Sequence, residues 1–135
     1  MKVVVDTNVY VSALVFGGVP RVSLMALKDQ PFQLVVSHEI RAELSDTLRR
    51  KFNWSQAQVT QTFRTLWAEA ECHKPTAVRS ARDPNDDHVL GCALAACAEI
   101  IMTGDKDLLV LHPFRKIAIL TPLDFLTLHA PGGYC

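Results

Sequence analysis

The sequence lacks an excess of charge of either sign. Fourteen Lys and Arg residues balance fourteen Asp and Glu residues, so the formal net charge at pH 7 is zero. Such a chain has no polycationic surface for nucleic acid, although a local basic groove is compatible with this balance. Hydrophobic residues make up 49% and charged residues 21%, which is typical of globular and not of disordered chains.

Long apolar runs and paired cysteines are also missing. No apolar run reaches the ~18 residues that a membrane-spanning helix needs. Asp6 interrupts the N-terminal apolar run before it is long enough for the core of a signal peptide. The four cysteines, Cys72, Cys92, Cys97 and Cys135, form no Cys-x-x-Cys pair, which argues against a zinc knuckle. We therefore expect a cytoplasmic protein with free thiols and no membrane association.

The chain has no internal repeat, low-complexity tract or linker, and 135 residues suit one domain. Short apolar segments predict strands over residues 2–5, 32–36, 98–102 and 116–120. Helical patterns alternate with them over about residues 20–29, 38–50, 55–71, 83–97, 106–111 and 121–128. This alternation predicts a three-layer α/β/α domain with a mainly parallel central sheet, which we assign to residues 1–129. Residues 130–135 are expected to form a flexible tail.

The first candidate site residue is Asp6, which directly follows three consecutive valines. Such a β-branched run is typical of a strand buried on both faces. The end of such a strand is where open α/β folds bind ligands. A carboxylate beside apolar neighbours is costly unless a cation or several donors compensate it. Since capping of a turn explains Asp6 equally well, a chemical role depends on other acids at the same sheet edge.

Glu43 is the second candidate, in the helix predicted over residues 38–50. Ile40, Leu44 and Leu48 form the apolar stripe of that helix, and Glu43 lies roughly 90° from its centre. Glu43 is too far from the helix start for the helix dipole to explain it, and no basic residue follows four positions later. A solvated surface glutamate remains the structural alternative, but the rim position favours a functional role.

Asp86 and Asp105 complete the set of candidate acids. Asp86 lies in the first turn of the helix predicted to begin at Asp83, in the middle of its apolar stripe. A capping box with Asp83 is the structural alternative for Asp86. Asp105 follows the strand over 98–102 and repeats the strand-then-carboxylate order of Asp6, although it is also suited to cap the next helix.

These acids are expected to converge because parallel strands bring their C-terminal ends to one edge of the sheet. Asp6 and Asp105 share that edge, Asp86 begins a helix that starts near it, and Glu43 has to reach across. Carboxylates so close together repel one another. A hard divalent cation bound through oxygen, Mg²⁺ or Mn²⁺, relieves this repulsion and supports chemistry on a phosphoryl group.

Four motifs resemble, in order, the acidic motifs of PIN-domain ribonucleases. They are Val5-Asp6-Thr7-Asn8, the helix carrying Glu43-Leu44, Asp83-Pro84-Asn85-Asp86-Asp87 and Thr103-Gly104-Asp105. The resemblance covers about residues 2–128 and is greatest to bacterial and archaeal toxins of type II toxin–antitoxin systems. It implies an Mg²⁺- or Mn²⁺-dependent endoribonuclease in which water attacks phosphorus in line and leaves a 5′-phosphate.

The resemblance also implies roles for individual residues and partners. Asp6, Glu43, Asp86 and Asp105 would hold the metal directly or through water. The supporting residues would be Thr7 and Asn8 in the Asp6 loop, Thr103 beside Asp105, Asp87 as the alternative to Asp86, and Asp107 as a second acid near Asp105. The implied partners are an RNA substrate, a cognate antitoxin and a second copy of the chain in a homodimer.

Two other classes of function are compatible with parts of the pattern. One is a binding module for RNA or protein, since the family includes members with degraded sites. The other is an Mg²⁺-dependent phosphotransfer enzyme, but a receiver-like domain needs an acidic pair after its first strand. A haloacid-dehalogenase-type phosphatase needs Asp-x-Asp, and this chain has Asp6-Thr7-Asn8. The presence of all four acids favours the nuclease.

Overall fold

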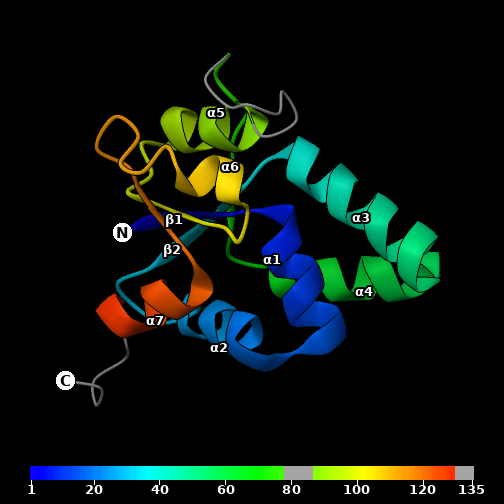
Figure 1. Cartoon of the computed structure of the whole chain (residues 1–135). Coiled ribbons are helices and arrows are strands. Elements are labelled where there is room, and N and C mark those ends of the chain that lie inside the picture. Colours follow the sequence, from blue (N-terminus) through cyan, green and yellow to red (C-terminus); the bar gives the residue numbers. More distant parts are fainter. Residues whose placement is uncertain (78–86, 130–135) are drawn as a thin grey trace.

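A parallel sheet forms the centre of the computed structural model, which describes residues 1–77 and 87–129 (Figure 1). Within this part of the chain its strands are β1 (Lys2–Val5), β2 (Gln33–Val36), β3 (Glu71–Cys72), β4 (Ile100–Met102) and β5 (Ala118–Leu120). Their order is β3-β2-β1-β4-β5, and every neighbouring pair is parallel. The predicted α/β class with a parallel sheet is confirmed.

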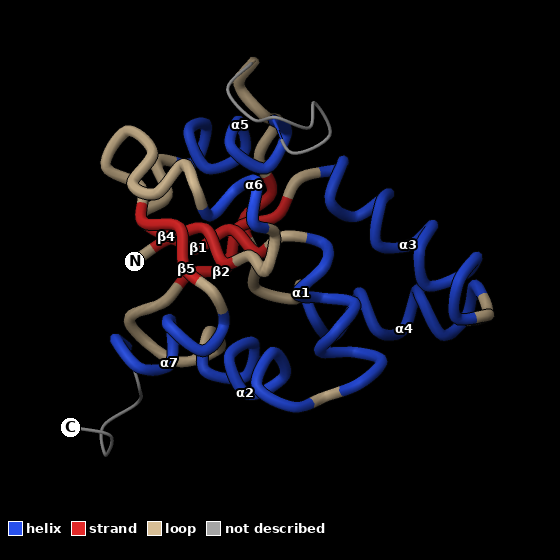
Figure 2. Tube along the Cα trace, in the orientation of Figure 1, coloured by secondary structure: helices blue, strands red, loops and turns tan. Residues whose placement is uncertain are grey.

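Helices cover both faces of this sheet. They are α1 (Thr7–Val11), the π-helical turn η1 (Ser12–Phe16), α2 (Gly18–Ala26), α3 (His38–Phe52), α4 (Gln56–Leu66), α5 (Asp87–Ala96), α6 (Lys106–Leu109) and α7 (Pro122–His129). Figure 2 shows α5 and α6 on one side of the sheet and α2 and α7 on the other, while α3 and α4 extend away from it together. The layers are therefore those of the predicted three-layer domain.

The valine run lies at the centre of the sheet, as its composition predicts. Val3, Val4 and Val5 are fully buried in β1, which pairs with β2 on one side and β4 on the other. A strand with a neighbour on each side and helices above and below has no solvent-facing position, so β-branched side chains fill every one. The register pairs Val5 with Met102, which fixes where the residues after both strands lie.

Two local signals set the start of the long helices α3 and α4. The Ser37 side chain accepts a hydrogen bond from the amide of Ile40 at 3.1 Å and caps α3. Ser55 and Gln58 form a reciprocal capping box at the start of α4. The stripe of Ile40, Leu44 and Leu48 is fully buried, as predicted. These caps fix the residue at which each helix begins.

The segment between β1 and β2 is helical from Thr7. The sequence analysis predicted no helix or strand between Asp6 and residue 20. The chain passes through α1 and η1, turns at Gly17 with a φ of +78°, and begins α2 at Gly18 instead of Pro20. Within the described residues no single helix is long and apolar enough to cross a membrane. Only the bent pair Thr7–Phe16 and Gly18–Ala26, at 111°, passes that test jointly, by length and composition.

Other boundaries also differ: β4 begins at Ile100 and β5 at Ala118, each two residues after the predicted start, and α6 ends at Leu109 instead of residue 111. The helix predicted to reach residue 71 ends at Leu66, and the short strand β3 follows it; this strand was not predicted. The described part of α5 begins at Asp87, while Asp83 and Asp86 lie outside the described residues, as does the predicted tail over 130–135. The predictions that concern those residues stay predictions.

Candidate active site

Asp6 and Thr103 lie side by side because of the register between β1 and β4. Val5 pairs with Met102, so the next residue of each strand leaves the sheet at the same point. The Asp6 amide donates to the Met102 carbonyl at 2.9 Å, and the Thr103 hydroxyl donates to Oδ2 of Asp6 at 2.8 Å. Asp6 is only 4% exposed and Thr103 is fully buried. The carboxylate of Asp6 is therefore held in one orientation at the edge of the sheet.

Thr103 also connects Asp6 to Asp105. The Asp105 amide donates to Oγ1 of Thr103 at 3.0 Å, so a single hydroxyl bonds to groups of both acids. The Asp105 carboxylate accepts a hydrogen bond from the Asp107 amide at 2.8 Å and caps α6. Asp105 thus caps α6, as its structural alternative predicts, and also lies beside Asp6, while the supporting role predicted for Thr103 stays a prediction.

Glu43 approaches the same edge from α3 and is bonded to His88 of α5. Oε2 of Glu43 and Nε2 of His88 are 2.9 Å apart. The hydrogen bond from His88 lowers the pKa of Glu43, and the Thr7 hydroxyl nearby acts in the same direction. Oγ1 of Thr7 is buried and makes no hydrogen bond of normal geometry within the described residues. Glu43 therefore stays ionised beside a buried polar oxygen.

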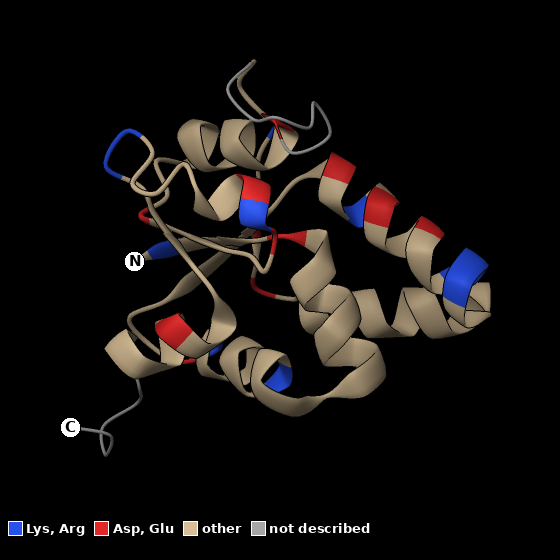
Figure 3. Ribbon diagram, in the orientation of Figure 1, with Lys and Arg blue, Asp and Glu red and all other residues tan. Residues whose placement is uncertain are grey.

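The electrostatics of Asp6 show that the three acids share one environment. Burial raises the pKa of Asp6, the hydrogen bonds from Thr103 and from the Thr7 backbone oppose this, and the charges of Glu43 and Asp105 raise it further. Acidic residues gather on α3, on α6 and at the start of α1 around one end of the sheet (Figure 3). Within the described residues no Lys or Arg makes an ion pair with Asp6 or Asp105.

The structure thus brings together three of the four predicted acids, Asp6, Glu43 and Asp105; the fourth, Asp86, lies outside the described residues. Asp87 is half-buried as the first described residue of α5. Asn8 is exposed in the first turn of α1 and Asp107 is half-buried in the first turn of α6. The supporting residues lie on the elements that surround the acids, and their predicted roles stay predictions.

The sequence analysis missed His88. It reaches Glu43 across 45 positions in the chain, and no spacing rule connects a residue of α3 with one of α5 over that distance. The only local signal was its place directly after Asp87 in an otherwise apolar helix. His88 supplies the basic partner for Glu43 that was sought four residues later on the same helix.

The donor set of this cluster fits a hard divalent cation. Three carboxylates supply anionic oxygens, and the charge of buried Asp6 has no cationic side chain paired with it in the part of the chain that the structure describes. Oxygen donors of this kind bind Mg²⁺ or Mn²⁺ in preference to softer metals. No three His, Cys, Asp or Glu side chains of residues 1–77 and 87–129 are already arranged around a single metal position. Asp6, Glu43 and Asp105 would hold such a cation directly or through water.

A family model described as PIN domain matches residues 2–107, which include Asp6, Glu43 and Asp105. The chain belongs to the PIN-domain family. This PIN domain is also similar in fold to a solved structure of VapBC2 from Rickettsia felis bound to a DNA fragment from its promoter. The match has a TM-score of 0.56 and 17% sequence identity and covers 89% of this chain and 97% of the other. At this identity the likeness supports the fold alone. Comparison with curated proteins gives no match.

The contact between His88 and Glu43 predicts a pH-dependent contribution to stability. The hydrogen bond to Glu43 raises the pKa of His88 above its ordinary 6.5, and the charges of Glu43, Asp6 and Glu39 act in the same direction. A raised histidine pKa stabilises the fold below pH 6.5, and this contribution is lost as the pH rises through the raised value. The lowered pKa of Glu43 gives a contribution that is present above its ordinary 4.5.

His88→Gln should therefore lower the free energy of unfolding more at about pH 5.5 than at about pH 9, because glutamine retains a donor but no charge. Urea denaturation in EDTA at the two pH values measures this difference. His73→Gln is the comparison variant, since His73 makes the same kind of contact with Glu71 at the end of β3, two strands away from β1. Equal losses at both pH values for His88→Gln would contradict the ion-pair interpretation.

Proposed function

We propose that this PIN domain is a metal-dependent endoribonuclease and the toxin of a toxin–antitoxin pair. The observation that carries the proposal is the group formed by Asp6, Glu43 and Asp105 at the C-terminal edge of the sheet. Asp6 is buried, oriented by Thr103, and repelled by the two other acids without a cationic partner among the described residues. A purely structural role gives no reason to keep a buried charge in such a place.

The chemistry follows from what these side chains can hold. A divalent cation bound here supplies an acidified water and neutralises negative charge on a phosphodiester. Asp6, Glu43 and Asp105 would hold it directly or through water, with Asp86 as the fourth predicted ligand. Thr103 fixes the orientation of Asp6 through the 2.8 Å hydrogen bond, and His88 fixes that of Glu43 through the 2.9 Å contact. The side chains are therefore oriented before substrate arrives, which lowers the cost of assembling the site.

The choice of substrate and partner is supported by the family and by the solved relative. PIN domains are generally nucleases. The acidic motifs of this chain resemble those of PIN-domain ribonucleases. The similar fold in VapBC2, a complex bound to promoter DNA, supports a cognate antitoxin as the partner of this chain. The homodimer expected from the resemblance remains a prediction.

The test is cleavage of a fluorescently labelled single-stranded RNA. We expect cleavage in Mg²⁺ or Mn²⁺ that leaves a 5′-phosphate, and loss of all cleavage in excess EDTA, because the carboxylates alone supply no electrophile. Restoring Mn²⁺ after EDTA should restore the rate. Cleavage that persists in EDTA, or RNA binding without cleavage in either metal, would contradict the proposal; the second result favours a binding module.

A further inference from the structure

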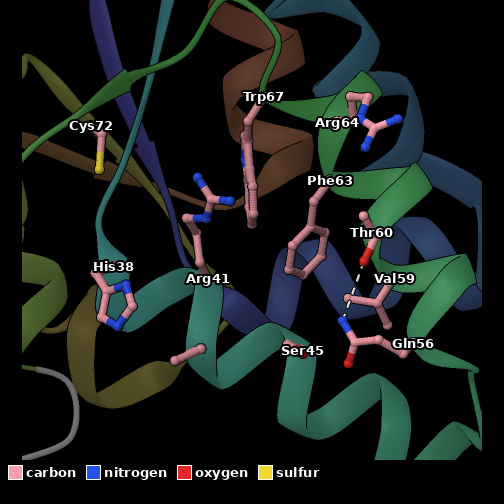
Figure 4. Close-up of a pocket in the computed structure, with 11 residues that line it drawn as sticks. His38, Arg41, Ser45, Gln56, Val59, Thr60, Phe63, Arg64, Trp67 and Cys72 are labelled. Atoms are coloured by element: carbon pink, nitrogen blue, oxygen red, sulfur yellow. Dashed lines mark hydrogen bonds between the residues drawn. The ribbon is translucent and has the colours of Figure 1, made fainter.

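The helices α3 and α4 enclose a groove on the side of α3 away from Glu43. Its volume is about 630 Å³, and its walls include His38, Arg41, Phe63, Arg64, Trp67 and Cys72 (Figure 4). Among the described residues that line it, none is aspartate or glutamate. Arg41 and Glu43 are two positions apart and so lie about 200° apart around the helix axis. The helix α3 is thus a wall shared by this α3–α4 groove and the acidic site.

Flat side chains lie against one another inside the α3–α4 groove, with the Phe63 and Trp67 rings tilted by 50°. Figure 4 shows the Trp67 ring between Arg41 and Phe63. The Arg41 guanidinium lies 5.4 Å from the Trp67 ring centroid, and the rings of Phe63 and Trp67 are 4.5 Å apart. The Trp67 indole donates a hydrogen bond to the buried Tyr10 hydroxyl at 3.0 Å, and this bond anchors Trp67 to the core. Guanidinium planes and aromatic rings are the surfaces on which unpaired bases stack.

The two arginines of the groove carry charge that no carboxylate within residues 1–77 and 87–129 pairs with. Neither Arg41 nor Arg64 makes an ion pair with another described residue, and both are exposed. On the same helix α3, by contrast, Arg50 pairs with Asp46 at 2.8 Å. In a chain of zero net charge, two arginines without an ion pair to any described residue, beside a cluster of flat side chains, form a local patch complementary to a phosphate backbone.

The α3–α4 groove begins at the same edge of the sheet as the acidic site. His38 follows β2 and Cys72 ends β3, while Asp6 follows β1, and these strands are consecutive neighbours in the sheet. Strands lie about 4.8 Å apart, so the end of β3 is only about 10 Å from the end of β1. A strand of RNA held at the acidic site can therefore continue over the first turn of α3 into the groove.

We propose that the α3–α4 groove binds a single-stranded segment of the RNA substrate next to the bond that is cleaved. Bases stack on Arg41 and Phe63, and Arg64 contacts phosphate. This inference rests on the proposed function, since it takes RNA to be the substrate, and it adds where the substrate lies beyond the acidic cluster. It also requires the bound segment to be unpaired, because stacked bases of a duplex are not accessible to the groove.

Binding is measured in an Asp6→Asn background, where the RNA stays intact, by fluorescence anisotropy with a labelled 12-nucleotide single strand. We expect Phe63→Leu, which keeps an apolar side chain, to weaken binding by about tenfold. Arg64→Ala should weaken binding several-fold. It should also make the slope of log K against log[salt] less steep, by the amount that corresponds to about one phosphate contact. Lys51→Ala removes the same charge from α3 outside the groove and should change affinity less than about twofold.

The cysteines give a second readout in the same Asp6→Asn background, and this readout needs no variant of the groove. Cys72 is exposed in the groove, whereas Cys97 is exposed after α5, at the opposite edge of the sheet. Saturating RNA should slow alkylation of Cys72 by iodoacetamide about fivefold or more and leave the rate at Cys97 unchanged, as followed by mass spectrometry. The same RNA annealed to its complement should protect Cys72 much less.

Three results would overturn the inference: no RNA binding, equal affinities of the groove variants and Lys51→Ala, or an unprotected Cys72 in the RNA complex. Any of these leaves a protein segment as the better occupant of the groove. Failure of the proposed function looks different, since it appears as no metal-dependent cleavage by the wild-type chain. Metal-dependent cleavage together with RNA binding that does not depend on the groove residues would support the proposed nuclease function. It would contradict only the proposal that the α3–α4 groove binds RNA.

Discussion

Asp6→Asn is expected to reduce metal-dependent RNA cleavage by at least about 10²–10³-fold while leaving the fold at least as stable as wild type. The carboxylate is buried, and burial together with the charges of Glu43 and Asp105 raises its pKa. Its ionised form is therefore a cost to the folded state near neutral pH. Asparagine keeps an oxygen that accepts the Thr103 hydrogen bond, removes the charge, and weakens any cation site at this edge.

Two measurements on one protein preparation check this prediction: the initial rate of RNA cleavage in Mn²⁺, and the urea midpoint without metal. Asp46→Asn is the matched control, because Asp46 is exposed on α3 and pairs only with Arg50 among the described residues. It should leave the cleavage rate within about twofold of wild type. An Asp6→Asn protein that cleaves normally would show that the chemistry does not need Asp6, and one that loses both activity and folding would show that Asp6 serves the fold.

Gly91→Ala is expected to destabilise the protein by about 2 kcal/mol, although alanine usually favours a helix interior over glycine by about 1 kcal/mol. Gly91 lies inside α5, and its carbonyl accepts a hydrogen bond from the Thr76 amide at 3.0 Å. A Cβ at this position would stand 2.0 Å from the Thr76 carbonyl oxygen and 3.2 Å from Cβ of Pro75. Backbone atoms cannot rotate away as a flexible side chain does, so the segment that carries Pro75 and Thr76 would have to move.

Thermal unfolding followed by circular dichroism measures this effect, and a fall in Tm of about 5–10 °C is expected. Gly104→Ala is the control, since a Cβ at Gly104 would meet no atom within 4 Å and the backbone there is not left-handed. Gly104 belongs to the motif Thr103-Gly104-Asp105, but the structure leaves room for a side chain at this position. A Tm for Gly91→Ala equal to or above that of Gly104→Ala would contradict the packing described for α5.

Most of the fold was predictable because its determinants are local. The valines of β1 specify a strand buried on both faces without reference to any other segment. Ser37 and Ser55 begin α3 and α4 through hydrogen bonds to amides three residues later, a spacing visible in the sequence. Alternating strands and helices then leave few topologies for a right-handed parallel sheet.

The elements that were missed depend on distant contacts. The strand β3 has only Glu71 and Cys72, and its extended conformation comes from pairing with Val35 and Val36 of β2. Two residues carry no period by which a strand can be recognised. The helix after β1 has only five residues in α1 and continues as the π-helical turn η1, so its sequence shows no regular amphipathic stripe of α-helical period.

The same distinction explains the site. Asp6 and Asp105 were predictable because each follows a buried strand, and parallel strands end at one edge. Glu43 was predictable only as an unexplained acid on the rim of a stripe, since its partner His88 is 45 residues away. The α3–α4 groove was not predictable at all, because Arg41, Phe63 and Trp67 meet only when α3 and α4 pack together.

The measurement that tests the central claim most directly is anomalous diffraction from a crystal of the wild-type protein soaked in Mn²⁺. The claim is that Asp6 and Asp105, with Glu43 beside them, form one site for a divalent cation. We predict an anomalous peak within about 2.0–2.4 Å of carboxylate oxygens of both aspartates. A fully soaked crystal with no peak between Asp6 and Asp105, or with Mn²⁺ bound only elsewhere, would contradict the claim.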